Sequence, residues 1–264
     1  MQYEGVITKM QTEHGKPIQY YLVFESSFLN MNQLLGSEIE LEMTGYQCLN
    51  CSRRKKVFRQ GFCYDCFTSS AHAGEWIIRP ELSTAHLGIA DRDLDHEAMV
   101  QLQPHIVYLA VSCEVKVGVT RKSQIPTRWI DQGAHLAIEI VEVPNRYLAG
   151  ITEVVLKNHY TDKTNWKRML LNEIIECDLH AERLKVVDLL PEEVRSLFSN
   201  SAFSPTEIHF PVLEYPKSIT TINFEKSRII RGRLVGIKGQ YLLFENGTAF
   251  NVRAAEGALV RISV

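Results

Sequence analysis

Four cysteines in a short polar stretch place the strongest constraint on how this chain can fold. Two residues separate Cys48 from Cys51, two separate Cys63 from Cys66, and eleven residues join the pairs. Four thiolates at this spacing can close a tetrahedron around one zinc ion, with no open position for catalysis. Because the stretch is too short and polar to bury a core, the metal would supply its folding energy. The spacing predicts a structural zinc site; reduced cysteines or an iron–sulfur site are the alternatives.

The loop between the two cysteine pairs is strongly basic. Its cations are Arg53, Arg54, Lys55, Lys56 and Arg59, and the aromatic residues Phe58, Phe62 and Tyr64 interleave with them or follow them. Clustered cations favour contact with the phosphates of a nucleic acid, and aromatic rings can stack on exposed bases. The alternative is a solvated loop whose aromatic rings pack beneath it.

The rest of the chain does not add to this positive charge. The formal net charge is −2, so any contact with nucleic acid must use a local patch. The apolar run near Ile106 is too short to cross a bilayer, and the first ten residues contain no apolar signal core. We therefore expect a cytoplasmic protein with no membrane partner. In that compartment, six cysteines favour metal binding or free thiols over disulfides.

Both ends of the chain carry the same order of β-forming segments. The echo is QYYLVFE at residues 19–25 and QYLLFE at residues 240–245, followed by alternating segments at residues 38–42 and 259–262. Alternation of polar and apolar residues predicts half-buried strands. We expect two small β modules that pack together, because a short two-stranded unit alone is marginally stable. A closing scaffold is favoured over a partner platform, since loops more often carry function.

The middle of the chain predicts an alternation of strands and helices. The expected elements are strands at 106–111 and 115–120, a helix from Pro126 to 132, a strand at 135–143, a helix from Asn145 to about His159, and a helix at 166–175. Within the helix expected from Asn145 to about His159, Ala149 and Gly150 leave a bare patch one turn before Glu153. We expect room there for a substrate or metal ion beside the carboxylate.

This order resembles the GIY-YIG nuclease superfamily over roughly residues 105–175. Ile106-Val107-Tyr108 stands in place of the first motif and Lys116-Val117-Gly118 in place of the second, while Arg128, Glu153 and Asn165 match the helix arginine, the metal-binding glutamate and the late asparagine. The first motif lacks its glycine and the second lacks its tyrosine. A zinc cluster ahead of such a domain also resembles an uncharacterised bacterial protein family of unknown function.

The resemblance implies a role for each matched residue. Glu153 would hold one magnesium or manganese ion, Tyr108 would position or deprotonate the attacking water, Arg128 would stabilise charge on the phosphoryl oxygens, Lys116 would be a cation near the phosphate, and Asn165 would hold the site together by hydrogen bonding. Arg121, at the end of the second strand, joins the candidate nucleic-acid contacts. A plain structural origin is the alternative, such as an i,i+4 pair of Glu153 with Lys157, or a pair of Arg128 with Asp131.

We therefore expect an α+β protein. Its parts are an N-terminal β module (1–44), a zinc ribbon (45–80), a GIY-YIG-like domain (104–175), a helical connector (176–204) that ends in a linker around Ser199-Asn200-Ser201, and a C-terminal β module (205–264). The expected function is a metal-dependent phosphodiesterase acting on DNA or RNA. The two altered motifs leave a zinc-containing nucleic-acid-binding protein without catalysis as the alternative. The sequence names no protein partner.

Overall fold

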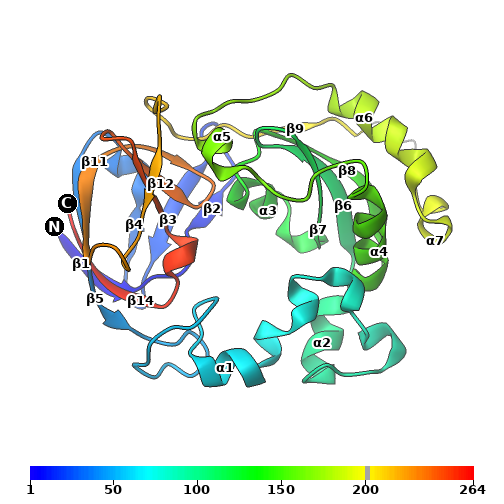
Figure 1. The fold of residues 1–264 in the computed structure, drawn as a ribbon, viewed down its shortest axis with the longest axis horizontal. Coiled ribbons are helices and arrows are strands. Elements are labelled where there is room, and N and C mark those ends of the chain that lie inside the picture. Colours follow the sequence, from blue (N-terminus) through cyan, green and yellow to red (C-terminus); the bar gives the residue numbers. More distant parts are fainter. Residues whose placement is uncertain (200–202) are drawn as a thin grey trace. The chain divides into compact units, whose positions relative to one another are not determined.

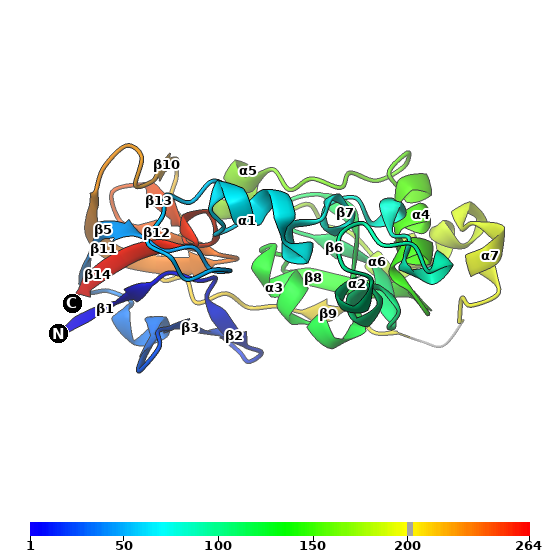
Figure 2. The same cartoon turned by 90° about the horizontal axis from the view of Figure 1, so that it is seen from below.

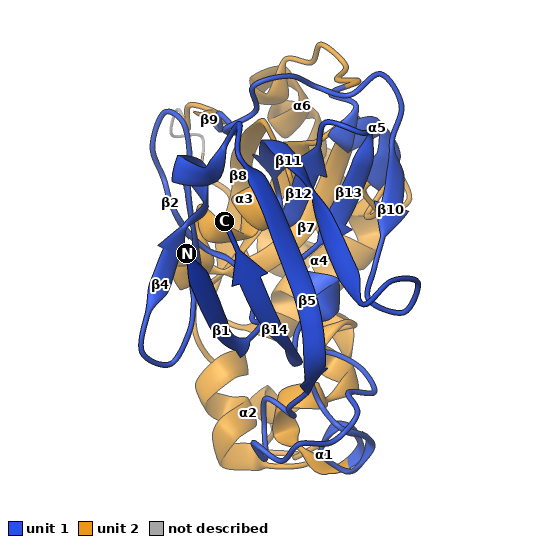
Figure 3. Ribbon diagram, turned by 90° about the vertical axis from the view of Figure 1, so that its left-hand side faces the viewer, with its two compact units in different colours: residues 1–68, 166–172, 208–264 blue, residues 69–165, 173–207 orange. Residues whose placement is uncertain are grey.

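The computed structural model describes residues 1–199 and 203–264 and confirms the α+β class. The chain forms two compact units, shown in blue and orange in Figure 3. Unit 1 contains Met1–Thr68, Trp166–Asn172 and Ile208–Val264, and unit 2 contains Ser69–Asn165 and Glu173–Glu207. Asn200 and Ser201 of the expected linker lie outside the described residues. The five-part division made from the sequence stays a prediction.

Unit 1 is built on a seven-stranded sheet that joins both ends of the chain. Its order is β1 (Gln2–Val6), β14 (Ala258–Ser263), β5 (Glu38–Tyr46), β11 (Ile229–Lys238), β12 (Tyr241–Phe244), β13 (Thr248–Asn251) and β10 (Thr220–Ile222), and only β10 and β13 pair in parallel. Figure 1 shows blue early strands beside orange and red late strands, and in the sheet order β5 lies between β14 and β11. The expected packing of the terminal β segments is confirmed, with Gln2 opposite Ser263.

A smaller sheet and short helices complete unit 1. The sheet contains β2 (Gln11–Glu13), β3 (Gln19–Val23) and β4 (Phe28–Asn30). The 3-10 turn η1 (Met31–Leu34) follows β4, and a second 3-10 turn, η8 (Arg253–Ala255), precedes β14. Helix α5 (Trp166–Leu170) is shorter than the helix expected at 166–175. The chain turns at Asn172, whose φ of 58° is left-handed. Asparagine tolerates this conformation, and its Oδ1 accepts a hydrogen bond from Lys238 Nζ at 2.8 Å.

Unit 2 contains the expected succession of strand, strand, helix, strand and helix. The sheet has the order β7 (Val115–Arg121), β6 (His105–Val111), β8 (Leu136–Val143) and β9 (Thr206–Glu207), and the helices are α3 (Thr127–Asp131), α4 (Arg146–Leu156), α6 (Leu179–Val186) and α7 (Glu192–Arg195). Asn145 caps α4 by accepting a hydrogen bond from the Leu148 amide at 2.9 Å. Pro126 stands at the cap position of α3 and not inside its first turn.

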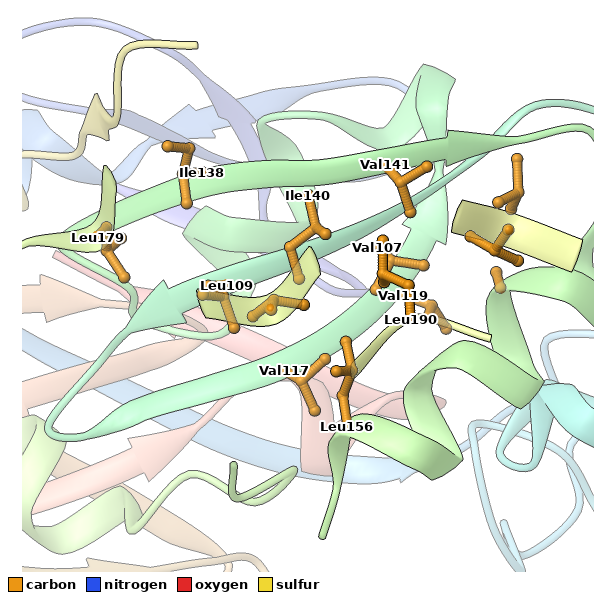
Figure 4. Packing of buried hydrophobic residues seen from close by; sticks show 14 of the residues in the cluster. Val107, Leu109, Val117, Val119, Ile138, Ile140, Val141, Leu156, Leu179 and Leu190 are labelled. Carbon is orange, nitrogen blue, oxygen red and sulfur yellow. The ribbon is translucent and has the colours of Figure 1, made fainter. Parts of the chain in front are cut away.

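The core of unit 2 lies on one face of this sheet. Val107, Leu109, Val117 and Ile138 belong to one cluster of buried residues that also contains Leu156 of α4 and Leu179 of α6 (Figure 4). Successive side chains of a strand point to opposite faces. The residues between these core positions, which include Tyr108 on β6 and its register partner Gly118 on β7, therefore face the other side of the sheet.

The other helical elements of unit 2 are short. They are helix α2 (Leu94–Gln101), labelled in Figure 2, and the 3-10 turns η2 (Ala71–Ala73), η3 (Glu75–Ile77), η4 (Pro80–Leu82), η5 (Ala85–Leu87), η6 (Lys122–Gln124) and η7 (Val187–Leu189). Buried Glu97 accepts hydrogen bonds from the backbone amides of Asp91, Arg92 and Asp93. Across the described part of the chain, no helix combines the length and apolar character needed to span a membrane.

Candidate metal centre and polar cluster

The four cysteines of the sequence pattern converge in unit 1. Cys48 and Cys51 follow strand β5, whereas Cys63 directly precedes helix α1 (Tyr64–Ser69) and Cys66 lies within it. Their Sγ atoms all lie within 4.8 Å of one another, and Cys51 Sγ is 4.0 Å from Cys63 Sγ. The predicted cluster is therefore confirmed as a set of four sulfur ligands that can hold one metal ion.

The backbone around the cysteines turns tightly enough to bring the two pairs together. Ser52 and Gly61 adopt left-handed φ values of 56° and 77°. A side chain at Gly61 would collide with Leu49, so glycine is needed for both its φ and its size. The backbone amide of Cys63 donates to Cys48 Sγ at 3.2 Å. These contacts tie one pair to the other across the loop.

The thiols of the cluster have opposite tendencies to ionise. Burial acts to raise the pKa of Cys48, but backbone amides of Cys51, Cys63 and Asn50 outweigh it and lower this pKa to about 6. A hydrogen bond from Asn50 acts to lower the pKa of Cys66, yet burial and the neighbouring thiols raise it to about 12. Four thiolates this close together need a cation to balance their negative charge. Four sulfur ligands are a donor set that zinc prefers.

The predicted basic loop is exposed, while its aromatic residues divide into two groups. All five cations, Arg53, Arg54, Lys55, Lys56 and Arg59, are exposed, and Lys55 Nζ pairs with Asp65 at 2.7 Å. Phe62 packs against the cysteines, as the structural alternative requires. Phe58 and Tyr64 remain 48% and 62% exposed, so these two rings do not pack beneath the loop.

A second cluster of polar residues forms in unit 2 around Tyr108. This side chain is fully buried, and its hydroxyl donates to Gln132 Oε1 at 2.9 Å. Gly118 makes room for the ring, because a Cβ there would lie 2.6 Å from the hydroxyl oxygen. Burial raises the pKa of Tyr108, against opposing effects of Arg128 and Gln132, and the Glu153 carboxylate adds to the rise. Tyr108, Arg128 and Glu153 therefore interact electrostatically.

Lys116 stands on the same strand and face as Gly118. It is 3% exposed, and its Nζ donates to Thr164 Oγ1 at 2.5 Å. Burial and the positive charge of Arg128 lower the pKa of Lys116 to about 7, whereas Cys113 acts in the other direction. At neutral pH this amine therefore exists partly as a free base.

Glu153 lies on α4 and is 8% exposed. Its Oε2 is 3.3 Å from Lys157 Nζ, which confirms the i,i+4 pair that was the structural alternative. Burial raises the pKa of Glu153, while Lys157 acts to lower it and Asp162 acts to raise it. Among residues 1–199 and 203–264, the four cysteines are the only group of three or more potential side-chain metal ligands. Glu153 therefore belongs to no such group, and the second carboxylate near it is that of Asp162, whose Oδ2 also lies 3.3 Å from Lys157 Nζ.

The bare patch expected beside Glu153 is not open. A Cβ at Gly150 would collide with the backbone of Pro80 and Glu81, so η4 already fills this space. Sequence patterns did not reveal this cover, because η4 is nearly seventy residues away along the chain. The prediction of room for a ligand at this patch was wrong.

Arg146 is a member of the cluster that the sequence analysis missed. Its Nε and Nη2 donate to the carbonyl oxygens of Trp76 and Ile77 at 3.1 and 2.7 Å. Burial lowers its pKa to about 10, against the attraction of the Glu153 carboxylate. Gly150 and Glu153 follow it by four and seven residues, which places all three on one helix face. Its position directly after the Asn145 cap was the available signal.

The other predicted residues lie at the margins of this cluster. Asn165 is exposed, and its backbone carbonyl accepts a weak hydrogen bond from Cys113 Sγ at 3.8 Å. Its neighbour Thr164 is the residue that contacts Lys116. Arg121 ends strand β7 opposite His105, whose burial lowers its pKa to about 4.

The fold and the four-cysteine cluster define a two-unit α+β protein with a potential zinc site. Residues 36–260 match the sequence profile of the family described as "Protein of unknown function (DUF2797)". The chain belongs to this family, which confirms the predicted membership in a family of unknown function. No curated protein matches the chain, and no solved structure matches its fold. The family match does not address the GIY-YIG resemblance, which stays a prediction.

Proposed function

We propose that the polar cluster of unit 2 is the active site of a metal-dependent phosphodiesterase that acts on DNA or RNA. The observation that carries the proposal is the gathering of polar groups from four separate elements. Tyr108 on β6, Lys116 on β7, Arg128 on α3 and Glu153 on α4 are linked by the interactions of Tyr108 and Lys116 described above. The GIY-YIG resemblance places the same four residues in a nuclease site. A buried tyrosine, lysine and glutamate with altered pKa values, beside an arginine, are typical of a reactive site.

Glu153 and Arg128 fit two requirements of phosphodiester cleavage, namely a metal ligand and a group that stabilises charge on the phosphoryl oxygens. A magnesium or manganese ion bound at Glu153 would neutralise charge on the scissile phosphate. One carboxylate is compatible with magnesium, which commonly keeps several waters and substrate phosphate oxygens as its other ligands. The guanidinium of Arg128 donates in a planar fork that suits the phosphoryl oxygens. Release of Lys157 from Glu153 would free the carboxylate for the ion.

Lys116 fits the role of general base better than Tyr108 does. A base works best when its pKa lies near the operating pH, and the pKa of Lys116 is about 7. The pKa of Tyr108 is raised, and its hydroxyl already donates to Gln132. We therefore assign the proton transfer to Lys116 and the orientation of the water to Tyr108. Asn165 is assigned to support of the Thr164 contact.

The four cysteines are assigned to one structural zinc ion, and the basic loop to nucleic-acid contact together with Arg121. Four sulfur ligands leave no open coordination position, so this ion would stabilise the fold and take no part in the reaction. None of the six cysteines is in a disulfide, which suits a reducing compartment. The proposed location is accordingly the cytoplasm.

A second candidate function is nucleic-acid binding without cleavage. It is favoured by the ion pair of Glu153 with Lys157 and by the segment that covers Gly150. In this case the fold of unit 2 has kept a phosphate-binding site and lost the chemistry.

A cleavage assay separates the two candidates. Zinc-loaded protein is incubated with labelled single- and double-stranded DNA and RNA and with magnesium or manganese. We expect metal-dependent cutting that Glu153→Gln abolishes and that Glu193→Gln, on an exposed helical turn of the same unit, leaves unchanged. Equal binding without cutting by the wild type and both variants would establish the second function instead.

A further inference from the structure

We propose that the loop between the cysteine pairs binds single-stranded nucleic acid by stacking unpaired bases on Phe58 and Tyr64. This inference rests on the proposed function in one respect, namely that nucleic acid is what the protein acts on. It adds the class of nucleic acid and the residues that distinguish it. The observation behind it is the coincidence of exposed aromatic rings and exposed cations on one loop.

The two rings are exposed yet held in place. Tyr64 packs edge-on against Phe58, with ring centroids 5.2 Å apart, and Phe67 packs against the same ring at 5.3 Å. Even so, 48% of Phe58 and 62% of Tyr64 are exposed. Ordered rings lose little conformational freedom when a ligand binds. Their open surface is thus ready for a planar partner.

The chemistry around the rings favours an anionic partner. Arg59 lies over Phe58, with its guanidinium carbon 5.5 Å from the ring centroid. Arg53, Arg54 and Lys56 are exposed on the same loop, and Lys55 pairs with the exposed Asp65. A ligand that has flat apolar faces linked by negative charges complements this surface. Nucleic acid has this combination, with bases for the rings and phosphates for the cations.

Stacking on these rings selects single strands over duplexes. In a duplex the base faces are covered by their neighbours, so a protein reaches only the base edges and the backbone. Entry into the major groove needs a helix or a two-stranded ribbon. The helix next to the loop, α1, has six residues, and its first residue is Tyr64 itself. Unpaired bases can instead be separated and laid on the rings.

The test is a fluorescence anisotropy titration of zinc-loaded full-length protein without added magnesium or manganese. The probes are labelled single-stranded DNA and RNA of twelve nucleotides, the matching duplexes, and an acidic peptide of poly-glutamate. The variants are Tyr64→Ala, Tyr64→Phe and Arg53→Gln/Arg54→Gln. Phe28→Ala is the matched control, because Phe28 is a 63% exposed aromatic residue on β4 of the same unit. Zinc content is measured for each variant, so that a folding defect is recognised.

We expect single strands to bind at least tenfold more tightly than duplexes. Tyr64→Ala should weaken single-strand binding about tenfold and leave its salt dependence unchanged, whereas Tyr64→Phe and Phe28→Ala should bind as the wild type does. Arg53→Gln/Arg54→Gln should reduce the slope of log K against log salt by about 1.4, since each phosphate contact contributes about 0.7 on single strands.

Three results would overturn the inference. They are equal affinity for duplexes and single strands, full single-strand binding by zinc-loaded Tyr64→Ala, or tighter binding of poly-glutamate than of any nucleic acid. The cleavage assay keeps this inference separate from the proposed function. Cutting that depends on Glu153 but ignores Tyr64→Ala would reject the loop alone. Single-strand binding that depends on Tyr64, without cutting, would reject the phosphodiesterase alone.

Discussion

The cysteine cluster of unit 1 and the polar cluster of unit 2 are assembled in opposite ways. All four cysteines come from a stretch of nineteen residues, Cys48 to Cys66, and two turns bring them together. The polar cluster draws Tyr108 and Glu153 from elements 45 positions apart and needs an intact sheet to hold them. We therefore expect the first cluster to depend on a bound metal ion for its stability, and the second to depend on the packing of the core.

Preventing metal binding should have the largest effect of the tests of this difference. Cys63→Ser should abolish zinc binding, because a tetrahedral site loses one ligand of four and zinc binding supplies about 10–16 kcal/mol in small zinc-dependent peptides. We expect zinc content to fall from one ion per chain to nearly none. Amide hydrogen exchange should become fast over residues 47–68 and stay slow in strand β6. A wild-type protein without zinc, or exchange that spreads equally through β6, would contradict the comparison.

A substitution at Gly150, where η4 packs against α4, should have the next largest effect. Gly150→Ala places a Cβ against the backbone of Pro80 and Glu81, which cannot move as a flexible side chain would. We expect the free energy of unfolding to fall by about 1–3 kcal/mol in a urea titration, although alanine favours a helix. In the control Gly45→Ala, the new Cβ meets Leu259 Cδ1 at an ordinary 3.5 Å. Equal unfolding curves for Gly150→Ala and the wild type would show that η4 is not packed there.

The exposed ion pair of the basic loop should have the smallest effect. Lys55→Gln and Asp65→Asn break a 2.7 Å contact, but both side chains are largely in water. Exposed pairs contribute little because solvent screens them. We expect no measurable change in Tm or in zinc content for either variant. A loss of zinc from Lys55→Gln would show that the loop helps to hold the metal site.

The same difference explains how much could be predicted from the sequence. The spacing of Cys48, Cys51, Cys63 and Cys66 predicted their convergence, because the distances involved are set by a short chain. Alternation predicted strands β5 and β8, and the repeated segments predicted that β modules from the two chain ends pack together. The structure joins β1, β5, β11, β12 and β14 in one sheet, whereas β3 lies in a separate three-stranded sheet. These features depend on local periodicity and on turn chemistry, which a sequence records directly.

Contacts between distant segments were not predictable in this way. Nothing near Gly150 in the sequence shows that Pro80 and Glu81 lie against it, and nothing near Arg146 shows its bonds to Trp76 and Ile77. Likewise, nothing in the sequence shows that Asn172, two residues after the end of α5, accepts a hydrogen bond from Lys238. Each of these depends on the three-dimensional fold, which residue patterns within one segment do not contain.

The central claim is that Lys116 and Glu153 belong to a working phosphodiesterase site, and a pH profile of single-turnover cleavage tests it most directly. The pKa of Lys116 is lowered from 10.5 to about 7, and a general base acts in its deprotonated form. We therefore predict a cleavage rate that rises with pH and levels off above about pH 7. Lys116→Met should lose at least about a hundredfold in rate and also lose this rise.

Stability gives an independent check that Lys116→Met remains folded. Because the folded pKa is depressed, the unfolded chain binds more protons between pH 7 and pH 10.5, so the buried lysine costs stability that is recovered as pH rises. Below pH 7 the variant should be more stable than the wild type. A stable Lys116→Met that cleaves with the wild-type rate and pH profile, or a wild type that does not cleave at any pH, would contradict the account.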